Sequence, residues 1–234
     1  MVNKLADKDM CQQIGTEKGL PAFAIEKGWW VVQTLSVVFQ LEIARSLLFK
    51  GGTSLSKAWN VIDRFSEDID LAMDRSFFRF DGNLSKNQRD KLKKISGKYV
   101  DENFYPELMK RLTATGFTDF KLELEETPES DRDRKINLYY PNVIDSPGYL
   151  QPRVQLELSS RSLRESFTVK TFSSFVDEAY PEKAFTTKLG KCRHSIETHP
   201  IRKITLVRGP DIFQKKWLLR PGRIRPDQTQ MQGL

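Results

Sequence analysis

The stretch from Phe49 to Leu71 reads FKGGTSLSKAWNVIDRFSEDIDL and combines a pair of glycines with a pair of acids. An apolar run before the glycines predicts a strand from Ser46 to Lys50. A helix is expected to follow from residue 53 or 54, whose hydroxyl can cap it, to about residue 62. Polar and apolar residues then alternate from Arg64 to Met73, which predicts a second strand. The stretch therefore predicts two strands joined by a glycine turn and a helix.

Gly51 and Gly52 lie where the chain turns from the first strand into the helix. Without side chains they let the backbone approach a ligand closely, and a helix N-terminus offers free N–H groups to an anion. Thr53 and Ser54 add hydroxyl donors, and Lys57 lies on the same helix, where it faces either phosphates or solvent. This pattern predicts a phosphate cradle, with a plain strand-to-helix turn as the alternative.

Asp68 and Asp70 flank Ile69 in the second strand, so the alternation places both carboxylates on one face. Like charges at this spacing repel, and a divalent cation bound by the pair removes the repulsion. Mg²⁺ prefers one or two carboxylates completed by water and by substrate phosphate oxygens. The pair therefore predicts a magnesium site, and the alternative is a solvent-facing strand edge that carries acids.

A third acid is expected in a later strand. Glu157 lies on the polar face of the alternating run Arg153–Ser159, and Glu123, in the run Phe120–Glu125, competes with it for this role. If the strand of Glu157 pairs beside that of Asp68 and Asp70, three acids converge and can hold two metal ions for an in-line phosphoryl displacement. The alternative for Glu157 is an exposed strand residue.

The rest of the chain predicts an α+β fold, with a mixed β-sheet flanked by helices and a helical or irregular C-terminal part. The apolar segment Pro21–Phe39 predicts a buried helix with Trp29 and Trp30 in the core. One or two amphipathic helices are expected between residues 85 and 116, broken near Pro106. Further strands are expected at residues 120–125, 135–140 and 153–159, with an exposed hairpin loop between the first two.

Composition excludes several classes of protein. The chain has 234 residues, 38% of them hydrophobic, which is enough for a substantial core and unlike a disordered or low-complexity chain. No apolar run approaches the roughly 20 residues of a membrane span, and the N-terminus lacks a signal-peptide core, so we expect a cytoplasmic protein with no membrane partner. Cys11 and Cys192 have neither disulfide-framework nor zinc spacing.

Positive charge gathers near the C-terminus. Residues 161–234 hold 15 Lys and Arg against 7 Asp and Glu, whereas the preceding residues are nearly balanced. We therefore expect a core over residues 1–165 and a basic region over 166–234, whose tail from about residue 220 is unpacked. The basic region fits contact with a polyanion, and a solvated tail is the alternative.

Two motifs, G-G-T-S-L-S-K and R-F-S-E-D-I-D-L, resemble the AbiEii/AbiGii toxin family of nucleotidyltransferases, within the polymerase β-like superfamily. The resemblance implies that the glycine-hydroxyl turn holds a nucleoside triphosphate and that the acids bind Mg²⁺. It implies a catalytic role for Glu157, and the segment Pro181–Leu189 makes Lys188 a candidate triphosphate contact. The residues carried over directly are Gly51, Gly52, Thr53, Ser54, Arg64, Ser66, Asp68 and Asp70.

The resemblance also implies a function. It indicates Mg²⁺-dependent transfer of a nucleoside monophosphate from an NTP to an acceptor, with tRNA as the candidate, by the toxin of a bacterial toxin–antitoxin or phage-defence pair. A cognate antitoxin would be its protein partner. The family's C-terminal T-F-x-E-K and H/D-x-x-D motifs are not found after residue 165, which leaves open a truncated or frame-shifted C-terminus and an inactive nucleic-acid- or antitoxin-binding remnant of the fold. A two-metal nuclease is the third alternative.

Overall fold

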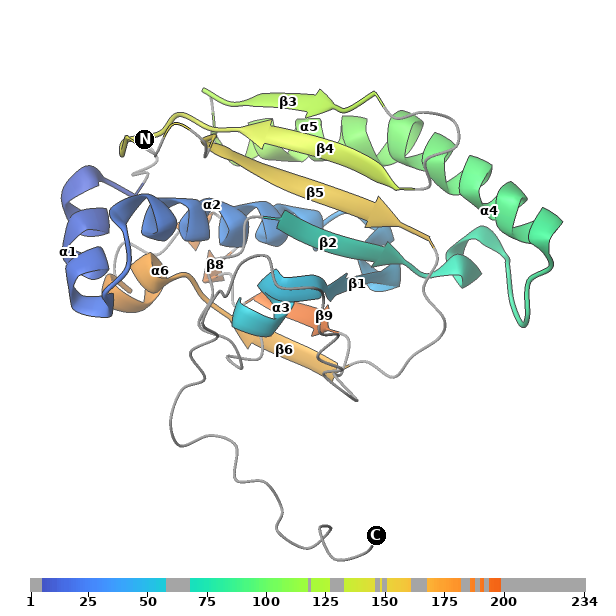
Figure 1. Cartoon of the computed structure of the whole chain (residues 1–234), viewed down its shortest axis with the longest axis horizontal. Coiled ribbons are helices and arrows are strands. Elements are labelled where there is room, and N and C mark those ends of the chain that lie inside the picture. Colours follow the sequence, from blue (N-terminus) through green and yellow to red (C-terminus); the bar gives the residue numbers. More distant parts are fainter. Residues whose placement is uncertain are drawn as a thin grey trace, which may run out of the picture.

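A mixed β-sheet with helices packed along it forms the molecule (Figure 1). The computed structural model describes residues 6–57, 68–117, 119–126, 133–145, 148, 151–160, 168–181, 186–187, 190–191 and 194–198. Its helical elements are α1 (Lys8–Lys18), α2 (Ala22–Val38), η1 (Glu42–Ser46), α3 (Gly51–Lys57), η2 (Arg75–Phe78), α4 (Lys86–Tyr99), η3 (Val100–Phe104), α5 (Tyr105–Ala114) and α6 (Phe175–Ala179). Its strands are β1 (Leu47–Lys50), β2 (Asp68–Met73), β3 (Lys121–Leu124), β4 (Arg134–Tyr139), β5 (Arg153–Ser159), β6 (Thr168–Phe172), β7 (Thr186–Thr187), β8 (Gly190–Lys191) and β9 (His194–Thr198).

Seven of these strands form one sheet in the order β3-β4-β5-β2-β1-β9-β6. Most neighbours are antiparallel, but β2 runs parallel to β5 and β1 runs parallel to β9. The remaining two strands, β7 and β8, pair with each other. The strands predicted around the glycine turn and over residues 120–159 are confirmed, and so is the α+β class with its mixed sheet.

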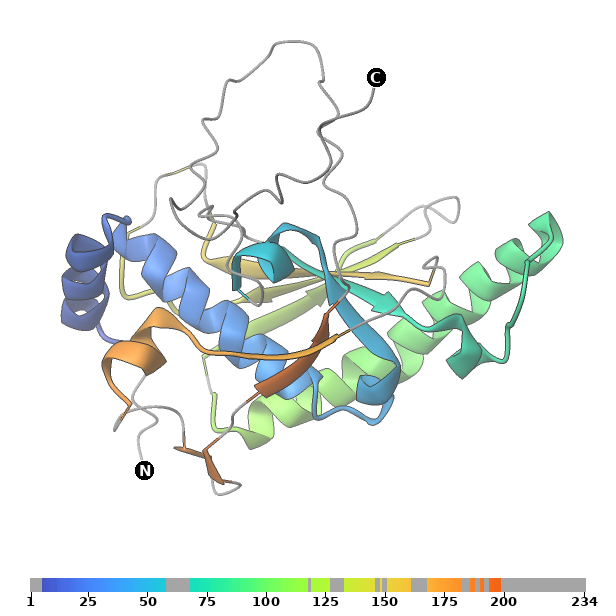
Figure 2. The same ribbon diagram turned by 90° about the horizontal axis from the view of Figure 1, so that it is seen from below.

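The central strands have one apolar and one polar face. Ile69 of β2, Leu156 of β5 and Ile136 of β4 stand opposite one another in register, and none of the three is exposed to solvent. Because side chains alternate along a strand, the intervening residues carry the polar groups on the other face. Figure 2 shows α2 and the α4–α5 run lying along one side of the sheet. The functional residues therefore lie on a face that the core does not use.

Helix α2 is buried over nearly its whole circumference, as its sequence predicted. Trp29 and Trp30 are 3% and 2% exposed, and the Trp30 ring stacks on Tyr140 with 5.0 Å between centroids. Further along, the carboxylate of Glu26 accepts hydrogen bonds from the backbone N–H groups of Val143 and Ile144. The helix thus supports the sheet and also anchors the connection between β4 and β5.

The helical run after Ser85 is not broken at Pro106, which corrects the sequence-based expectation. A capping box between Ser85 and Gln88 starts α4, and η3 is a π-helical segment that leads directly into α5. Pro106 lies in the first turn of α5, where a missing N–H costs least. The irregularity therefore appears as a π-helical turn before the proline, and the chain keeps its direction.

The described part of the C-terminal region extends the sheet. β9 pairs with β1 through Phe49 and Thr198, and β6 pairs antiparallel with β9. Helix α6 agrees with the predicted helical or irregular C-terminal part, whereas strands β6 and β9 were not predicted. The hairpin loop expected between β3 and β4 and the tail from about residue 220 lie largely or wholly outside the described residues. Among the described helices, none is long and apolar enough to cross a membrane.

Candidate active site

The glycine turn and the second acid are in direct contact. Gly51 has φ +75°, a left-handed conformation that favours glycine, and a Cβ built on it would lie 2.7 Å from Asp70 Cγ and overlap the carboxylate. In the β1–β2 ladder, Lys50 stands directly opposite Asp70. The first glycine therefore has two reasons to be glycine, its backbone conformation and the acid beside it.

The three predicted acids lie on neighbouring strands and on one face. In the parallel β2–β5 ladder, Asp70 stands opposite Glu157 and Asp68 opposite Gln155. Asp68 is exposed, while Asp70 and Glu157 are half-buried. Glu123, the competing third acid, is on β3, opposite Asn137 and three strands away from β2. The pairing that the three-acid hypothesis requires is present for Glu157 and absent for Glu123.

Asp70 lies in a crowded electrostatic environment. Burial raises the pKa of the Asp70 carboxyl, and the charges of Glu157, Asp68 and Asp133 raise that pKa further. Lys50 acts in the opposite direction, and its ammonium also donates a hydrogen bond to Ser159 Oγ at 3.2 Å. Sequence reasoning missed Lys50 and Asp133, because neither belongs to the D-x-D pattern.

Glu157 is held by a cation. Its Oε1 lies 3.2 Å from the Nζ of Lys135, which stands opposite it in the β4–β5 ladder. Within the described part of the chain, no three His, Cys, Asp or Glu side chains come close enough together to hold one metal ion. The acids therefore lie on one face of the sheet, and the charges of Asp68 and Glu157 act on Asp70. Glu157 is also oriented by its ion pair with Lys135.

The hydroxyl of Thr53 is used inside the protein. It donates a hydrogen bond to the backbone carbonyl oxygen of Asp68, and Thr53 is fully buried. Ser54 is also buried, at 2% exposed. This contact ties the start of α3 to the strand that carries the acids, so the Thr53 hydroxyl is engaged in the fold and is not turned to a ligand. Gly52, in the same turn, is partly exposed.

Lys57 is partly exposed and packs against an aromatic ring. Its Nζ lies 4.6 Å from the centroid of the Phe175 ring on α6 and 3.0 Å from the position of a Cβ built on Gly28 of α2. Burial lowers the pKa of the Lys57 ammonium, and the charge of Glu178 opposes that shift. Lys57 therefore lies as a cation over an aromatic ring, and its contact with phosphates stays a prediction. Lys188, Arg64 and Ser66 lie outside the described residues.

The comparison with protein families agrees with this arrangement. Residues 37–213 match the family model of the nucleotidyl transferase AbiEii toxin of type IV toxin–antitoxin systems. The match covers more than half of the chain and includes the glycine turn, β2 and β5. The chain therefore belongs to the AbiEii family of nucleotidyltransferase toxins. The matched region extends well beyond residue 165, although the family's C-terminal motifs are not found there. No curated protein matches the chain.

Proposed function

We propose that this chain transfers a nucleoside monophosphate from an NTP to a hydroxyl group of an RNA acceptor and releases pyrophosphate. The observation that carries the proposal is the β2–β5 pairing, which sets Asp70 opposite Glu157 while Asp70 touches Gly51. Acids and glycine turn thus meet at one place on the sheet. Family membership supports the reaction class, and tRNA is the acceptor we propose.

Mg²⁺ is the metal that we assign to this site. Asp68 and Asp70 share a face, and the neighbouring carboxylates that raise the pKa of Asp70 create a local negative potential that a cation would offset. Because Mg²⁺ commonly takes one or two protein carboxylates and completes its shell with water and phosphate oxygens, this donor set fits. When bound, the ion would neutralise charge on the phosphates of the NTP.

The glycine turn and Glu157 then have separate roles in the transfer. The backbone of the Gly51–Ser54 turn seats the β- and γ-phosphates, and Glu157, oriented by Lys135, accepts the proton of the attacking hydroxyl. The acceptor oxygen forms a bond to the α-phosphorus. The bond from that phosphorus to the bridging oxygen of the β-phosphate breaks, and pyrophosphate leaves with the electron pair. Lys188 is retained as a proposed triphosphate contact.

The biological setting follows from the family. We propose that the chain acts in the cytoplasm as the toxin of a bacterial abortive-infection or phage-defence system, and that a cognate antitoxin protein restrains it. The basic residues 166–234, whose strands β6 and β9 join the core sheet, are proposed to contact RNA.

Incorporation of labelled nucleotide tests the proposal. Purified chain, Mg²⁺ and total RNA are incubated with each of the four α-labelled NTPs, beside Asp68→Asn and Asp70→Asn variants whose melting temperatures are measured in parallel. We expect label in RNA with the wild type and none with either variant, at unchanged or higher melting temperature because a repelling charge is removed. Label that persists in both variants contradicts the assignment. RNA binding without incorporation under any NTP supports the inactive remnant instead.

A further inference from the structure

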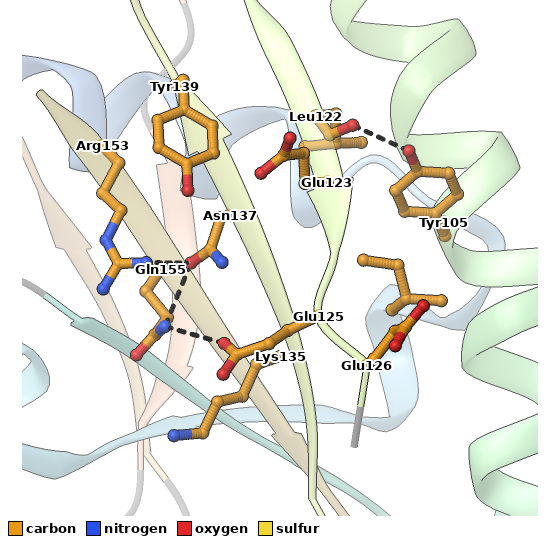
Figure 3. Close-up of a pocket in the computed structure, with 11 residues that line it drawn as sticks. Tyr105, Leu122, Glu123, Glu125, Glu126, Lys135, Asn137, Tyr139, Arg153 and Gln155 are labelled. Atoms are coloured by element: carbon orange, nitrogen blue, oxygen red, sulfur yellow. Dashed lines mark hydrogen bonds between the residues drawn. The ribbon is translucent and has the colours of Figure 1, made fainter.

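A cavity of about 750 Å³ lies on the polar face of the sheet, over β3, β4 and β5 (Figure 3). This volume lies within the range of small-molecule sites, roughly 300–1,000 Å³. The wall includes Lys135, whose ammonium contacts Glu157, so the cavity begins beside the third acid. Nothing in the nucleotidyltransferase motifs points to this cavity.

The floor of the cavity is a network of amide side chains with a defined polarity. Asn137 Oδ1 accepts hydrogen bonds from Arg153 Nη1 at 3.1 Å and from Gln155 Nε2 at 3.0 Å. Gln155 Nε2 also lies 3.4 Å from Glu125 Oε2. Because arginine only donates and a carboxylate only accepts, these neighbours fix which end of each amide faces them.

Two hydrogen-bonding groups of this network remain available. Within the described residues, the Asn137 amide nitrogen and the Gln155 carbonyl oxygen make no hydrogen bond, although Asn137 and Gln155 are only 5% and 9% exposed. Asn137 and Gln155 thus offer one donor and one acceptor on the cavity floor, the two kinds of group that hydrogen-bond to nucleobase edges. The Tyr139 ring lines the same cavity. An aromatic ring beside an amide pair offers a base both stacking and hydrogen bonds.

The position of the cavity indicates which substrate carries that base. In the sheet order, β1 and the glycine turn lie on one side of β2, whereas β5, β4 and β3 lie on the other. In an in-line displacement, the attacking oxygen and the leaving pyrophosphate lie on opposite sides of the phosphorus. With pyrophosphate on the β1 side, the attacking hydroxyl comes from the β5 side. Strands are about 4.8 Å apart, so the amides on β5 and β4 lie within about 10 Å of the acids on β2.

The charges of the lining disfavour a phosphate as the occupant. Three glutamates, Glu123, Glu125 and Glu126, line the cavity beside two cations, Lys135 and Arg153, and Lys135 is paired with Glu157. Acidic walls repel a phosphodiester but accept N–H groups, which nucleobases carry on their edges. Resting on the proposed nucleotide transfer, we propose that this cavity binds the base of the RNA nucleotide whose hydroxyl attacks the α-phosphorus of the NTP and becomes joined to the nucleoside monophosphate.

The test compares RNA oligonucleotides that end in a normal or an abasic nucleotide, with the full chain as wild type, Asn137→Asp and Gln12→Ala. Asn137→Asp keeps the oxygen that Arg153 and Gln155 need and replaces the open donor by an acceptor. Gln12 is exposed on α1 and serves as the control. We expect the wild type and the control to lose about 10-fold or more in kcat/KM on the abasic RNA, the scale of one good base contact. Asn137→Asp should lose as much on normal RNA and little more on abasic RNA, with KM for the NTP unchanged.

A binding measurement separates this inference from the proposed reaction. Fluorescence anisotropy of the same labelled oligonucleotides needs no transfer, so wild-type preference for the normal terminus, lost in Asn137→Asp, supports the cavity even if no nucleotide is incorporated. Asn137→Ala provides a second variant if Asn137→Asp melts early. Equal affinity for normal and abasic RNA, or a change confined to the KM of the NTP, overturns the proposal. Stronger competition by a polycation such as spermine than by a nucleoside would also overturn it, because the acidic walls would then define the ligand.

Discussion

The two halves of the polar face treat their hydrogen-bonding groups in opposite ways. In the β1–α3–β2 half, the contacts close on the protein itself: Gly51 packs against Asp70, and the Thr53 hydroxyl bonds to the backbone of Asp68. In the β3–β4–β5 half, Asn137 and Gln155 keep a donor and an acceptor open in a cavity. The first half holds the acids through internal contacts, whereas the second leaves hydrogen-bonding groups open to a cavity.

The two halves meet along the β2–β5 pair, where Glu157 gives the largest expected effect. Glu157→Gln removes the proton acceptor and keeps the shape, so we expect kcat to fall about 100-fold or more, the scale on which one electrostatic contributor to a transition state acts. Glu102→Gln, on the exposed surface of η3, should leave kcat unchanged. Labelled-NTP transfer measures both, and equal rates for the two variants would remove Glu157 from the mechanism.

A matched pair of glycines tests the rigidity of the first half. Gly82 has φ +67° and open space around it, whereas Gly51 has φ +75° and the Asp70 carboxylate beside it. Alanine should cost about 1–2 kcal/mol of unfolding free energy at either position because of the left-handed backbone. Gly51→Ala should cost at least about 1 kcal/mol more because a Cβ overlaps Asp70. Urea unfolding measures the difference, and equal losses would mean that the Asp70 contact is dispensable.

The buried hydroxyl of Thr53 should matter to stability by a smaller amount. Thr53→Val keeps the shape and leaves the Asp68 carbonyl without this donor, which costs about 1–3 kcal/mol. Thr113→Val, in which an exposed helical hydroxyl loses its bond to the Met109 carbonyl, should change stability by about 0.5 kcal/mol or less. If both variants unfold at the same urea concentration, the first half does not depend on the Thr53 bond.

Lys57 should give the smallest effect, visible as a pH dependence. Burial lowers its pKa below the ordinary 10.5, so between the two values the unfolded chain binds the extra proton. Wild-type stability should therefore rise with pH through that window. Lys57→Met lacks the buried charge, so its melting temperature should exceed that of the wild type at pH 7, and the difference should shrink toward pH 10.5. Thermal melts from pH 7 to 10.5 measure this slope. Lys18→Met, which removes an exposed cation near the same Phe175 ring, should keep the wild-type slope, and so would Lys57→Met if the burial were unimportant.

Local sequence patterns predict most of the β1–α3–β2 half. The glycine turn and the alternation around Asp68 and Asp70 are set by residues a few positions apart, and strands β1 and β2 were predicted there. The predicted helix start was wrong, because α3 begins at Gly51 and the Thr53 hydroxyl bonds to Asp68 instead of capping the helix. The direction of Lys57 was not predicted, because it depends on α2 and α6, which come from distant parts of the chain. The internal use of Thr53 likewise follows from the path of β2 beside α3.

The cavity in the β3–β4–β5 half could not be predicted without knowledge of the strand pairing. Asn137, Tyr139, Arg153 and Gln155 alternate as any half-exposed strand does, so nothing in the sequence distinguishes a cavity from an ordinary polar face. Only the register of β4 on β5 brings the two amides together. Strand order is likewise a long-range property that periodicity does not contain, and it sets Glu157, but not Glu123, opposite Asp70.

The mass of the RNA after reaction tests the central claim most directly. A defined RNA incubated with wild-type chain, Mg²⁺ and an NTP should gain the mass of whole nucleoside monophosphates, with one pyrophosphate released for each, and Asp70→Asn should yield neither. Shortened RNA would indicate a nuclease, and RNA of unchanged mass with every NTP would contradict nucleotide transfer by this chain.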